Sequence, residues 1–258
     1  MSDNLSKKFI KHGYVIVNLN NKSELKKIKN LVLSSVIKNT KLPTTVGKRN
    51  LLDNFHKFIK IEELNQLRLN IINEINKNKN FKNIYYNLVR NHLEELVGNE
   101  LAIQNRINLS IQLPKDDSSL LPLHADTWAG DSPFEVVVWI PMVNCYKTKS
   151  MFILDALKYE AFLKLFKKNK NRSSEHIYQK IKKDLKFLKI NYGQALIFNQ
   201  ALPHGNRINE ELATRWSFNC RFKGLFTPYG DKKLGEFFQP LSIKPATKIG
   251  MKYKLPNI

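Results

Sequence analysis

The spacing of apolar residues changes near residue 101, and this change divides the chain into a helical part and a strand-rich part. Residues 23–39 place apolar side chains three and four positions apart, which is the repeat of a helix with one buried stripe. Ser23 suits the N-cap of this helix, because its hydroxyl can accept a hydrogen bond from a backbone N–H of the first turn. The stripe consists of Leu25, Ile28, Leu31, Val32 and Val36.

Two further helices and one strand are expected among the first hundred residues. Residues 64–75 and 81–96 repeat apolar side chains at helical spacing, and Gly98 suits the C-terminal cap of the second helix. GYVIVNL, residues 13–19, is typical of a short strand. The first helix is expected to bury Leu64, Leu67, Ile71, Ile72 and Ile75, and the second Phe81, Ile84, Tyr85, Leu88, Leu93 and Leu96.

From residue 101 onward the pattern is that of β-strands. RINLSIQLP, residues 106–114, alternates strictly between polar and apolar positions, so the two kinds of side chain point to opposite faces of a strand. FEVVVWIPM, SMFIL, GQALIFN and RWSFNCRF also have strand composition. Residues 156–190, in contrast, repeat apolar side chains at helical spacing and predict a helical insertion.

These elements predict an α+β, mainly β fold in a single domain of residues 1–258. A helical layer, residues 1–100, is expected to pack on an antiparallel β core of residues 101–225 that carries the insertion 156–190. Residues 226–258 form a proline-punctuated tail without a clear pattern. A hydrophobic content of 42% in 258 residues is enough for a substantial core.

The chain is strongly basic, with 43 lysines and arginines against 22 acidic residues. The lysines are spread along the whole chain, and the densest runs, 164–172 and 180–189, fit the solvated faces of helices, so nucleic-acid binding is not expected. No apolar run is long enough to span a bilayer, and the first residues lack the apolar core of a signal peptide. Two cysteines, Cys145 and Cys220, cannot form a disulfide framework; a cytoplasmic location is expected.

The candidate chemistry begins in LPLHADTW, residues 121–128, where His124 and Asp126 stand two positions apart. In an extended segment this spacing points both side chains the same way. His204 follows the predicted strand ALIFN in LPHGN, and Arg215 comes eleven residues later, with Ser217 on the same strand face. Two imidazoles and one carboxylate are the ligand set that binds one face of Fe(II) and leaves other positions open.

This arrangement resembles the Fe(II)- and 2-oxoglutarate-dependent oxygenases. The long gap between Asp126 and His204 resembles the phytanoyl-CoA hydroxylase branch, and HADTWAGDSPFEVVVWIPMVNCYKTKSMFIL is similar to the StrG-like oxygenases of bacterial carbohydrate-biosynthesis clusters. The resemblance covers roughly residues 100–225 and implies a double-stranded β-helix, a cupin-like jelly roll, with iron at its mouth. It also implies that 2-oxoglutarate and O2 are cosubstrates, that Arg215 pairs with the far carboxylate of 2-oxoglutarate, and that Ser217 adds a hydrogen bond to it.

Neighbouring residues leave alternatives open. The polar face of residues 106–112, including Asn108, Ser110 and Gln112, either lines the cosubstrate site or faces water on an edge strand. Trp128 and Trp139 could line a substrate pocket, although aromatic residues of a β core more often serve packing. Asp131 fits the turn GDSP better than a substrate contact. The other four histidines, His12, His56, His92 and His176, are expected to be structural or solvated.

The resemblance implies hydroxylation of a C–H bond in a small, carbohydrate-type substrate, because Asp126 is retained where halogenating relatives lose the carboxylate. Desaturation and demethylation stay open, and the oligomeric state is not predicted. Two alternatives differ in class. Arg221 follows Arg215 by six positions, as in nucleic-acid dealkylating oxygenases, and the net charge of +21 would suit such a substrate. The other alternative is a jelly roll that binds a sugar without iron or catalysis.

Overall fold

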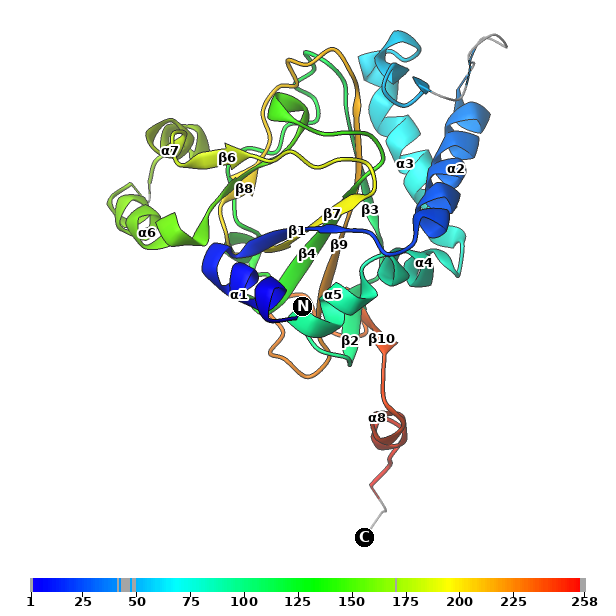
Figure 1. Cartoon of the computed structure of the whole chain (residues 1–258), viewed down its shortest axis with the longest axis vertical. Helices are drawn as coiled ribbons and strands as arrows, with labels where there is room; N and C mark the ends of the chain where they lie inside the picture. The colour runs from blue at the N-terminus through cyan, green and yellow to red at the C-terminus, as the bar shows by residue number, and fades with distance from the viewer. Residues whose placement is uncertain (1, 41, 43–46, 48–49, 170, 256–258) are drawn as a thin grey trace.

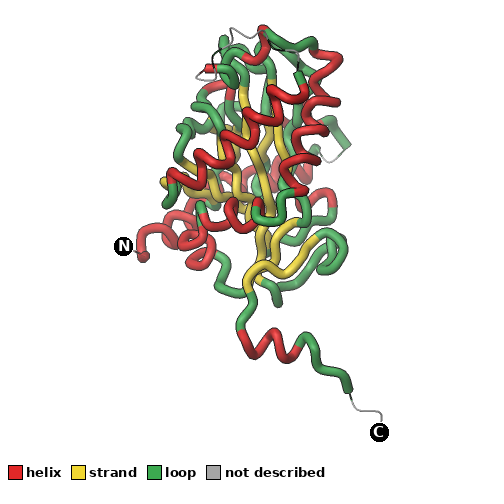
Figure 2. The backbone as a smooth tube through the Cα atoms, turned by 90° about the vertical axis from the view of Figure 1, so that its right-hand side faces the viewer, coloured by secondary structure: helices red, strands yellow, loops and turns green. Residues whose placement is uncertain are grey.

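The computed structural model describes residues 2–40, 42, 47, 50–169 and 171–255. Helices cover one face of a large antiparallel sheet, and a smaller sheet lies beside it (Figure 1). Figure 2 shows the long strands running through the body and the C-terminal segment leaving it. This mixture of helices and antiparallel strands confirms the predicted class, and two antiparallel sheets are consistent with the expected jelly-roll core.

The large sheet contains seven strands in the described part of the chain. Six follow the order β1-β7-β4-β9-β2-β10, and β3 pairs with β9 beside β2; all of these pairs are antiparallel. β9 is the longest strand, and its two halves pair with β3 and β2 on one edge and with β4 on the other. The strands are β1 (Tyr14–Asn18), β2 (Leu101–Gln104), β3 (Asn108–Gln112), β4 (Glu135–Pro141), β7 (Gln194–Asn199), β9 (Arg215–Gly224) and β10 (Phe238–Ser242).

The smaller sheet has the order β6-β5-β8, with β5 (Phe152–Leu154) between β6 (Leu185–Phe187) and β8 (His204–Gly205). An isolated antiparallel bridge joins His124 to His204 and so adds the segment before residue 126 to this sheet. β6 lies inside the insertion that was expected to be helical to residue 190. That prediction is wrong for residues 185–187, because pairing with β5 satisfies their backbone in place of a helix.

The helical layer agrees with the apolar pattern, but the structure differs in the start of one helix and in the burial of one stripe residue. α2 (Lys22–Asn39) and α3 (Ile61–Lys77) bury the predicted stripes, except that Leu31 is only half-buried. The N-cap of α2 is Asn21 and not Ser23: the Asn21 side chain accepts hydrogen bonds from the backbone N–H groups of Ser23 and Glu24. A short side-chain amide at the cap can satisfy two free N–H groups at once, which favours this start.

The predicted helix over residues 81–96 is two helices, α4 (Phe81–Asn87) and α5 (Arg90–Leu96). Val89, at φ −131°, leaves the helical region, and both Leu88 and Val89 are fully buried at the corner. A bend lets apolar side chains on both sides of the corner reach the core, which one straight helix could not do. Gly98 follows the C-cap residue Val97 at φ +120°, in agreement with the predicted capping role.

Several elements lie outside the predicted pattern. α1 (Ser2–His12) precedes β1, and β10 and α8 (Pro245–Gly250) follow the core in the tail. α6 (Tyr159–Lys168) and α7 (Ser174–Ile181) form the helical insertion, which projects from the body beside the small sheet (Figure 1). Short 3-10 helices occur at η2 (Phe55–Lys57), η3 (Asp126–Ala129), η4 (Lys147–Lys149) and η5 (Ala156–Lys158). That residues 1–258 form one domain stays a prediction.

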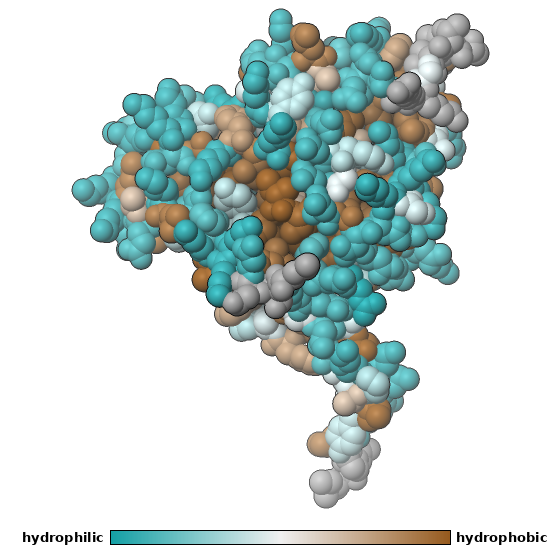
Figure 3. Space-filling model, in the orientation of Figure 1, coloured by the Kyte–Doolittle hydropathy of each residue, from teal (hydrophilic) through white to brown (hydrophobic). Residues whose placement is uncertain are grey.

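The main core lies between the helical layer and the large sheet. Tyr85 of α4 joins the two layers: its hydroxyl donates to the backbone oxygen of Val138 in β4 at 2.9 Å, and its ring meets Phe218 of β9. Figure 3 shows apolar surface gathered over β1 in the middle of one face and polar surface around it. Among the described residues, no helix is both long and apolar enough to cross a membrane.

Candidate metal centre

Strand β9 has one apolar and one polar face, and the polar face carries the candidate site. On the apolar face Phe218 meets the rings of Phe81 and Tyr85 at centroid distances of 5.6 and 6.5 Å. Because strand side chains alternate, the intervening residues point away from the helical layer. These residues are Arg215, Ser217, Asn219 and Arg221. Their antiparallel partners in β3 are Gln112, Ser110 and Asn108, opposite residues 215, 217 and 219 respectively.

Three side chains meet in front of this face. His124 and His204 form a β-bridge, in which each backbone N–H donates to the other's carbonyl at 3.0 and 2.8 Å. Asp126 begins η3, and its backbone N–H donates to the oxygen of Gln200 at 3.1 Å. One ligand atom from each of the three side chains lies within 4.8 Å of the other two. The residues predicted from two distant segments are therefore brought together.

Glycine after His204 is required by the close approach of a neighbouring loop. A Cβ atom at Gly205 would lie 2.6 Å from the backbone oxygen of Leu121 and 2.9 Å from that of Pro122. A residue with a side chain would therefore push the segment that carries His124 away from His204. Gly205 therefore allows the segments that carry His124 and His204 to lie close together.

Backbone carbonyls fix the orientation of both imidazoles. The Nδ1 atom of His124 lies 2.8 Å from the oxygen of Pro122, and that of His204 lies 2.8 Å from the oxygen of Leu202. A carbonyl can only accept a hydrogen bond, so each Nδ1 carries a proton, and in the neutral imidazole Nε2 then keeps its lone pair. This is the usual arrangement of metal-binding histidines, whose second nitrogen is held by an acceptor.

The electrostatics of the cluster act differently on its three side chains. Burial alone would lower the pKa of His124, but Asp126 and the Pro122 carbonyl outweigh it and raise that pKa. Burial, together with the charge of His124, lowers the pKa of His204 to about 4, so its imidazole is neutral at physiological pH. Burial alone would raise the pKa of Asp126, but the neighbouring His124, whose Nε2 lies 3.6 Å from Oδ1, and the charge of Arg221 outweigh it and hold that pKa well below its usual range. A neutral imidazole and an ionised carboxylate are the forms that bind a metal.

A cavity of about 260 Å³ opens in front of the cluster. Its apolar wall includes Trp139 and Phe198, and its polar wall is the face of β3 and β9 described above. Asn108 and Arg215, two of the predicted cosubstrate residues, line it. Gln112 and Ser217 do not line it. Both are fully buried and pair across the β3–β9 ladder with Arg215 and Ser110 respectively, and Gln112 donates to the backbone oxygen of Arg207 at 2.7 Å.

Arg215 is a buried cation without a carboxylate partner among the described residues. It is 3% exposed, and one of its terminal nitrogens donates to the hydroxyl of Ser110 at 3.0 Å, while its Nε atom has no acceptor. Burial lowers its pKa to about 10. The hydroxyl of Ser217 is also buried without a partner. An unsatisfied guanidinium at the cavity wall, with an unsatisfied hydroxyl two positions along the same strand face, fits an anionic ligand such as a carboxylate.

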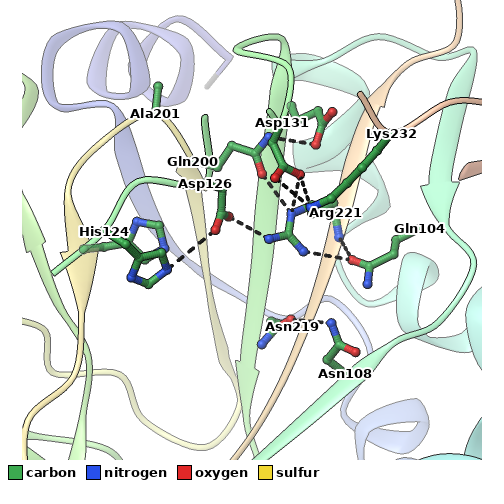
Figure 4. A network of polar contacts seen from close by, with 12 residues as sticks. Gln104, Asn108, His124, Asp126, Asp131, Gln200, Ala201, Asn219, Arg221 and Lys232 are labelled. Carbon is green, nitrogen blue, oxygen red and sulfur yellow. Dashed lines mark hydrogen bonds and ion pairs between the residues drawn. The ribbon is translucent and has the colours of Figure 1, made fainter. Parts of the chain in front are cut away.

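Arg221, whose role the sequence left open, forms an ion pair with Asp126 of the cluster. One terminal nitrogen is 2.9 Å from Oδ2 of Asp126, and Nε is 3.3 Å from Oδ1 of Asp131 (Figure 4). Nε also donates to the amide oxygen of Gln200 at 3.0 Å, and Lys232 lies 2.6 Å from Asp131. Asp131 was expected to shape a turn; it is 5% exposed and forms ion pairs with both Arg221 and Lys232. The sequence signal for Arg221 is its even spacing from Arg215 along one strand.

The C-terminal tail reaches this network through a second required glycine. Gly130, at φ +85°, ends η3, and a Cβ atom there would lie 2.0 Å from the carboxylate of Asp231. The backbone N–H of Asp231 donates to the oxygen of Gly130 at 2.9 Å, and this contact brings Lys232 to Asp131. A segment that sequence patterns left unassigned therefore contributes one charge to the site.

The remaining candidates have other surroundings. Trp128 is 42% exposed and stacks on Phe166 of the insertion at 4.7 Å instead of lining the cavity, whereas Trp139 does line it. The other four histidines lie outside the cluster, as expected: His12 pairs with Asp155, His56 with Thr214 and His92 with the oxygen of Asn18, and His176 lies in α7.

No protein-family model and no curated protein sequence matches the chain. Solved structures do. The chain has the fold of non-heme 2-oxoglutarate-dependent enzymes. The nickel complex of the non-heme monooxygenase ThoJ matches with a TM-score of 0.57 and 13% identity, over 93% of this chain and 84% of that one. The non-heme α-ketoglutarate-dependent carbocyclase SnoK of nogalamycin biosynthesis matches with 0.52 and 12%, over 94% and 97%.

A third match is HygX from Streptomyces hygroscopicus with nickel, 2-oxoglutarate and hygromycin B bound, with a TM-score of 0.53, 12% identity and coverage of 91% of each chain. At these identities the likeness is one of fold. The donor set agrees with it independently, because the His–Asp–His cluster and the unpaired Arg215 are consistent with Fe(II) and 2-oxoglutarate. Reaction type varies among these structures, which include a monooxygenase and a carbocyclase.

Proposed function

We propose that this protein is an Fe(II)- and 2-oxoglutarate-dependent oxygenase. The observation that carries the proposal is a juxtaposition: His124, Asp126 and His204 share one end of a cavity, and an unpaired buried arginine, Arg215, lines its wall. A metal site alone would fit many activities. A metal site beside a cation that lacks a counter-ion supports a cosubstrate with a carboxylate remote from the metal-binding end.

In this proposal each residue has a defined task. His124 and His204 offer Nε2, and Asp126 offers the carboxylate oxygen that does not face Arg221. Arg215 binds the far carboxylate of 2-oxoglutarate, and Ser110 holds the guanidinium in place. Ser217 adds a hydrogen bond from the same strand face, and Asn108 borders the substrate. Gln112 is the cross-strand partner of Arg215, and it is buried next to the cosubstrate site without lining the cavity.

Iron with 2-oxoglutarate, when bound, supplies the oxidation of an unactivated C–H bond by O2, with release of CO2 and succinate. The protein supplies position and a water-poor wall: Trp139 and Phe198 cover the cavity on one side. We further propose that the two sheets form a double-stranded β-helix and that the product is a hydroxylated carbohydrate-type molecule. The support for hydroxylation is the retained Asp126, and for the substrate it is the StrG-like resemblance of residues 124–154.

The spacing between Arg215 and Arg221 can be explained by contacts within the protein, without a nucleic-acid substrate. Arg221 is occupied by Asp126 and Asp131, both within the protein, and the spacing follows from two arginines on one face of β9. The dealkylase alternative therefore loses its specific sequence signal. A binding module without iron would have no use for two oriented imidazoles beside an ionised carboxylate.

The test is succinate formation by the purified protein with Fe(II), 2-oxoglutarate and O2. We expect iron-dependent succinate from the unaltered chain, slow in the absence of substrate, and none above background from Asp126→Ala, because one of three metal ligands is lost. The matched control is Asp117→Ala, which removes an exposed carboxylate nine residues earlier and outside the cluster. Unchanged succinate formation by Asp126→Ala, or no iron-dependent succinate from the unaltered chain, would contradict the proposal.

A further inference from the structure

A second cavity adjoins the one in front of the metal centre. It measures about 390 Å³ and is walled by the first turns of α3, by β3 and by residues 118–121. The two cavities share four lining residues: Asn108, Ser110, Leu121 and Asn219. We call the first the inner cavity and the second the outer cavity. A molecule that occupies both would have one end at the cluster and the other beside α3.

The outer cavity has a single charged lining residue in the described part of the chain, Arg68 of α3. Arg68 is half-buried, and one terminal nitrogen donates to the side-chain oxygen of Asn65 at 2.6 Å. No described carboxylate forms an ion pair with it. Its position follows from the helix pattern, since the preceding residue Leu67 faces the core and the next position turns toward the groove between α3 and β3.

The other polar groups of the outer cavity are neutral amides and hydroxyls. Asn65, Asn108 and Asn219 supply amides, and Ser118 and Ser119 are also among the lining residues. The contact between Asn108 and Asn219 is long, at 3.4 Å, so both amides can turn to a ligand. Amides and hydroxyls both donate and accept, which suits a ligand with several hydroxyl groups.

Carboxylates are scarce in both cavities. Asp126 is the single acidic residue among the lining residues of the two, and it is committed to Arg221 and to the candidate metal site. An ammonium group on a ligand would thus lie near Arg68, Arg215 and Arg221 without a free counter-ion, which is unfavourable. An anionic group would meet Arg68 and the positive field of a chain with net charge +21.

We propose that the outer cavity is the substrate subsite, and that it takes a hydroxylated organic anion, a molecule with a phosphate or carboxylate group that Arg68 binds. The inference rests on the proposed oxygenase function and narrows its substrate class. Arg68 acts as a specificity-determining residue: it holds the acid group at α3, and the amides of Asn108 and Asn219 guide the hydroxylated part toward the cluster. Aminated molecules are excluded by the same charges.

The test uses four probes of similar size with the iron- and 2-oxoglutarate-loaded protein: glucose 6-phosphate, gluconate, glucose and glucosamine. The measured quantity is the concentration of each probe that half-maximally changes the rate of succinate formation, by stimulation or inhibition. We expect that concentration to be at least tenfold lower for an anionic probe than for glucose or glucosamine. The phosphate and carboxylate probes distinguish the two kinds of acid group.

Two variants locate the effect. Arg68→Gln should abolish the preference for the anionic probe, because it removes the one charged side chain that lines the outer cavity in the described part of the chain. The matched control is Arg106→Gln. Arg106 is exposed and also donates to an asparagine of α3, Asn73 at 2.9 Å, but it lines neither cavity. The control should keep the full preference.

Three results would overturn the inference: equal effects of all four probes, a preference for glucosamine, or an anion preference that survives in Arg68→Gln. The failure of the proposed function would look different. In that case the unaltered protein would form no iron-dependent succinate even without a probe, whereas failure of the substrate inference alone leaves that reaction intact.

Discussion

Arg215 and Arg221 are the same residue type, on the same strand and the same face, yet their surroundings are opposite. Arg221 lies between the carboxylates of Asp126 and Asp131 and also donates a hydrogen bond to Gln200, so its charge is balanced inside the protein. Arg215 is more deeply buried and has a single serine hydroxyl as partner, with one nitrogen unsatisfied. One strand thus carries a neutralised cation at one end and an unneutralised cation at the other.

The difference indicates that one arginine has a structural role and the other a ligand-binding role. A buried ion pair that is complete within the chain fixes geometry, here the direction in which Asp126 presents its carboxylate. A buried charge that is left incomplete costs stability unless a ligand completes it. Under the proposed function, Arg221 positions the metal ligand Asp126 and Arg215 binds the cosubstrate, and each of these two roles can be tested separately.

The largest expected effect is on folding, in Arg221→Met. This change leaves Asp126 without its partner and Asp131 with Lys232 alone, so we expect a loss of about 3 kcal/mol in the free energy of unfolding. For a chain of this size the melting temperature should fall by roughly 6–12 °C. Calorimetry of the metal-free protein measures it. The control is Arg207→Met, which breaks a surface pair with Glu175 and should cost under about 1 kcal/mol. Equal losses in the two variants would refute the distinction.

The next effect is on cosubstrate binding, in Arg215→Met. We expect the affinity for 2-oxoglutarate to fall about 30- to 150-fold, or about 2–3 kcal/mol, because a buried carboxylate would lose a charged hydrogen-bond partner. The melting temperature of the ligand-free protein should stay the same or rise, since an unpaired buried charge is removed. Calorimetric titration of the nickel-loaded protein gives the affinity without turnover. A large loss of stability with unchanged affinity would reverse the roles assigned to the two arginines.

Ligand-induced stabilisation sharpens the same contrast. With nickel bound and 2-oxoglutarate at about a hundred times its dissociation constant, the unaltered protein should gain about 2.7 kcal/mol, or roughly 5–10 °C in melting temperature. Arg215→Met should lose most of this gain at the same ligand concentration. Arg221→Met should keep most of it from a lower starting temperature. If both variants lose the gain equally, the far carboxylate is not bound by Arg215 alone.

The sequence was informative about the cluster because its signals are local. His124 and Asp126 are two residues apart in an extended segment, and His204 follows a recognisable strand, so chemistry and spacing coincide. Arg215 was found for the same reason. The apolar repeats also predicted α2 and α3, and alternation or strand composition predicted β1, β3, β4, β7 and β9 of the large sheet, but not β2 or β10.

What the sequence could not give depends on tertiary contacts. The partners of Arg221 come from residues 126 and 131, which meet β9 only once η3 and the large sheet are in place. The bend at Val89 and the strand β6 inside the insertion arise from packing and pairing that outweigh local spacing. Lys232 reaches the site through a loop without any periodic pattern. A role for Arg68 can be inferred only from the cavity that it lines.

The smallest expected effect is on stability, in Lys232→Met. This change tests whether the ion pairs that link Lys232, Asp131, Arg221 and Asp126 are energetically coupled. Lys232 lies 2.6 Å from Asp131 but its side chain is 29% exposed, so solvent already screens part of the interaction. Lys232→Met should therefore cost about 1 kcal/mol in unfolding free energy, well below Arg221→Met, because Asp131 keeps Arg221. A double-mutant cycle of the two changes measures their coupling by denaturant unfolding. We expect the double variant to lose more than the sum of the single losses, since Asp131 then has neither cation. Strict additivity would show that the tail and the metal ligand are stabilised independently, and that the chain from Lys232 to Asp126 does not act as a unit.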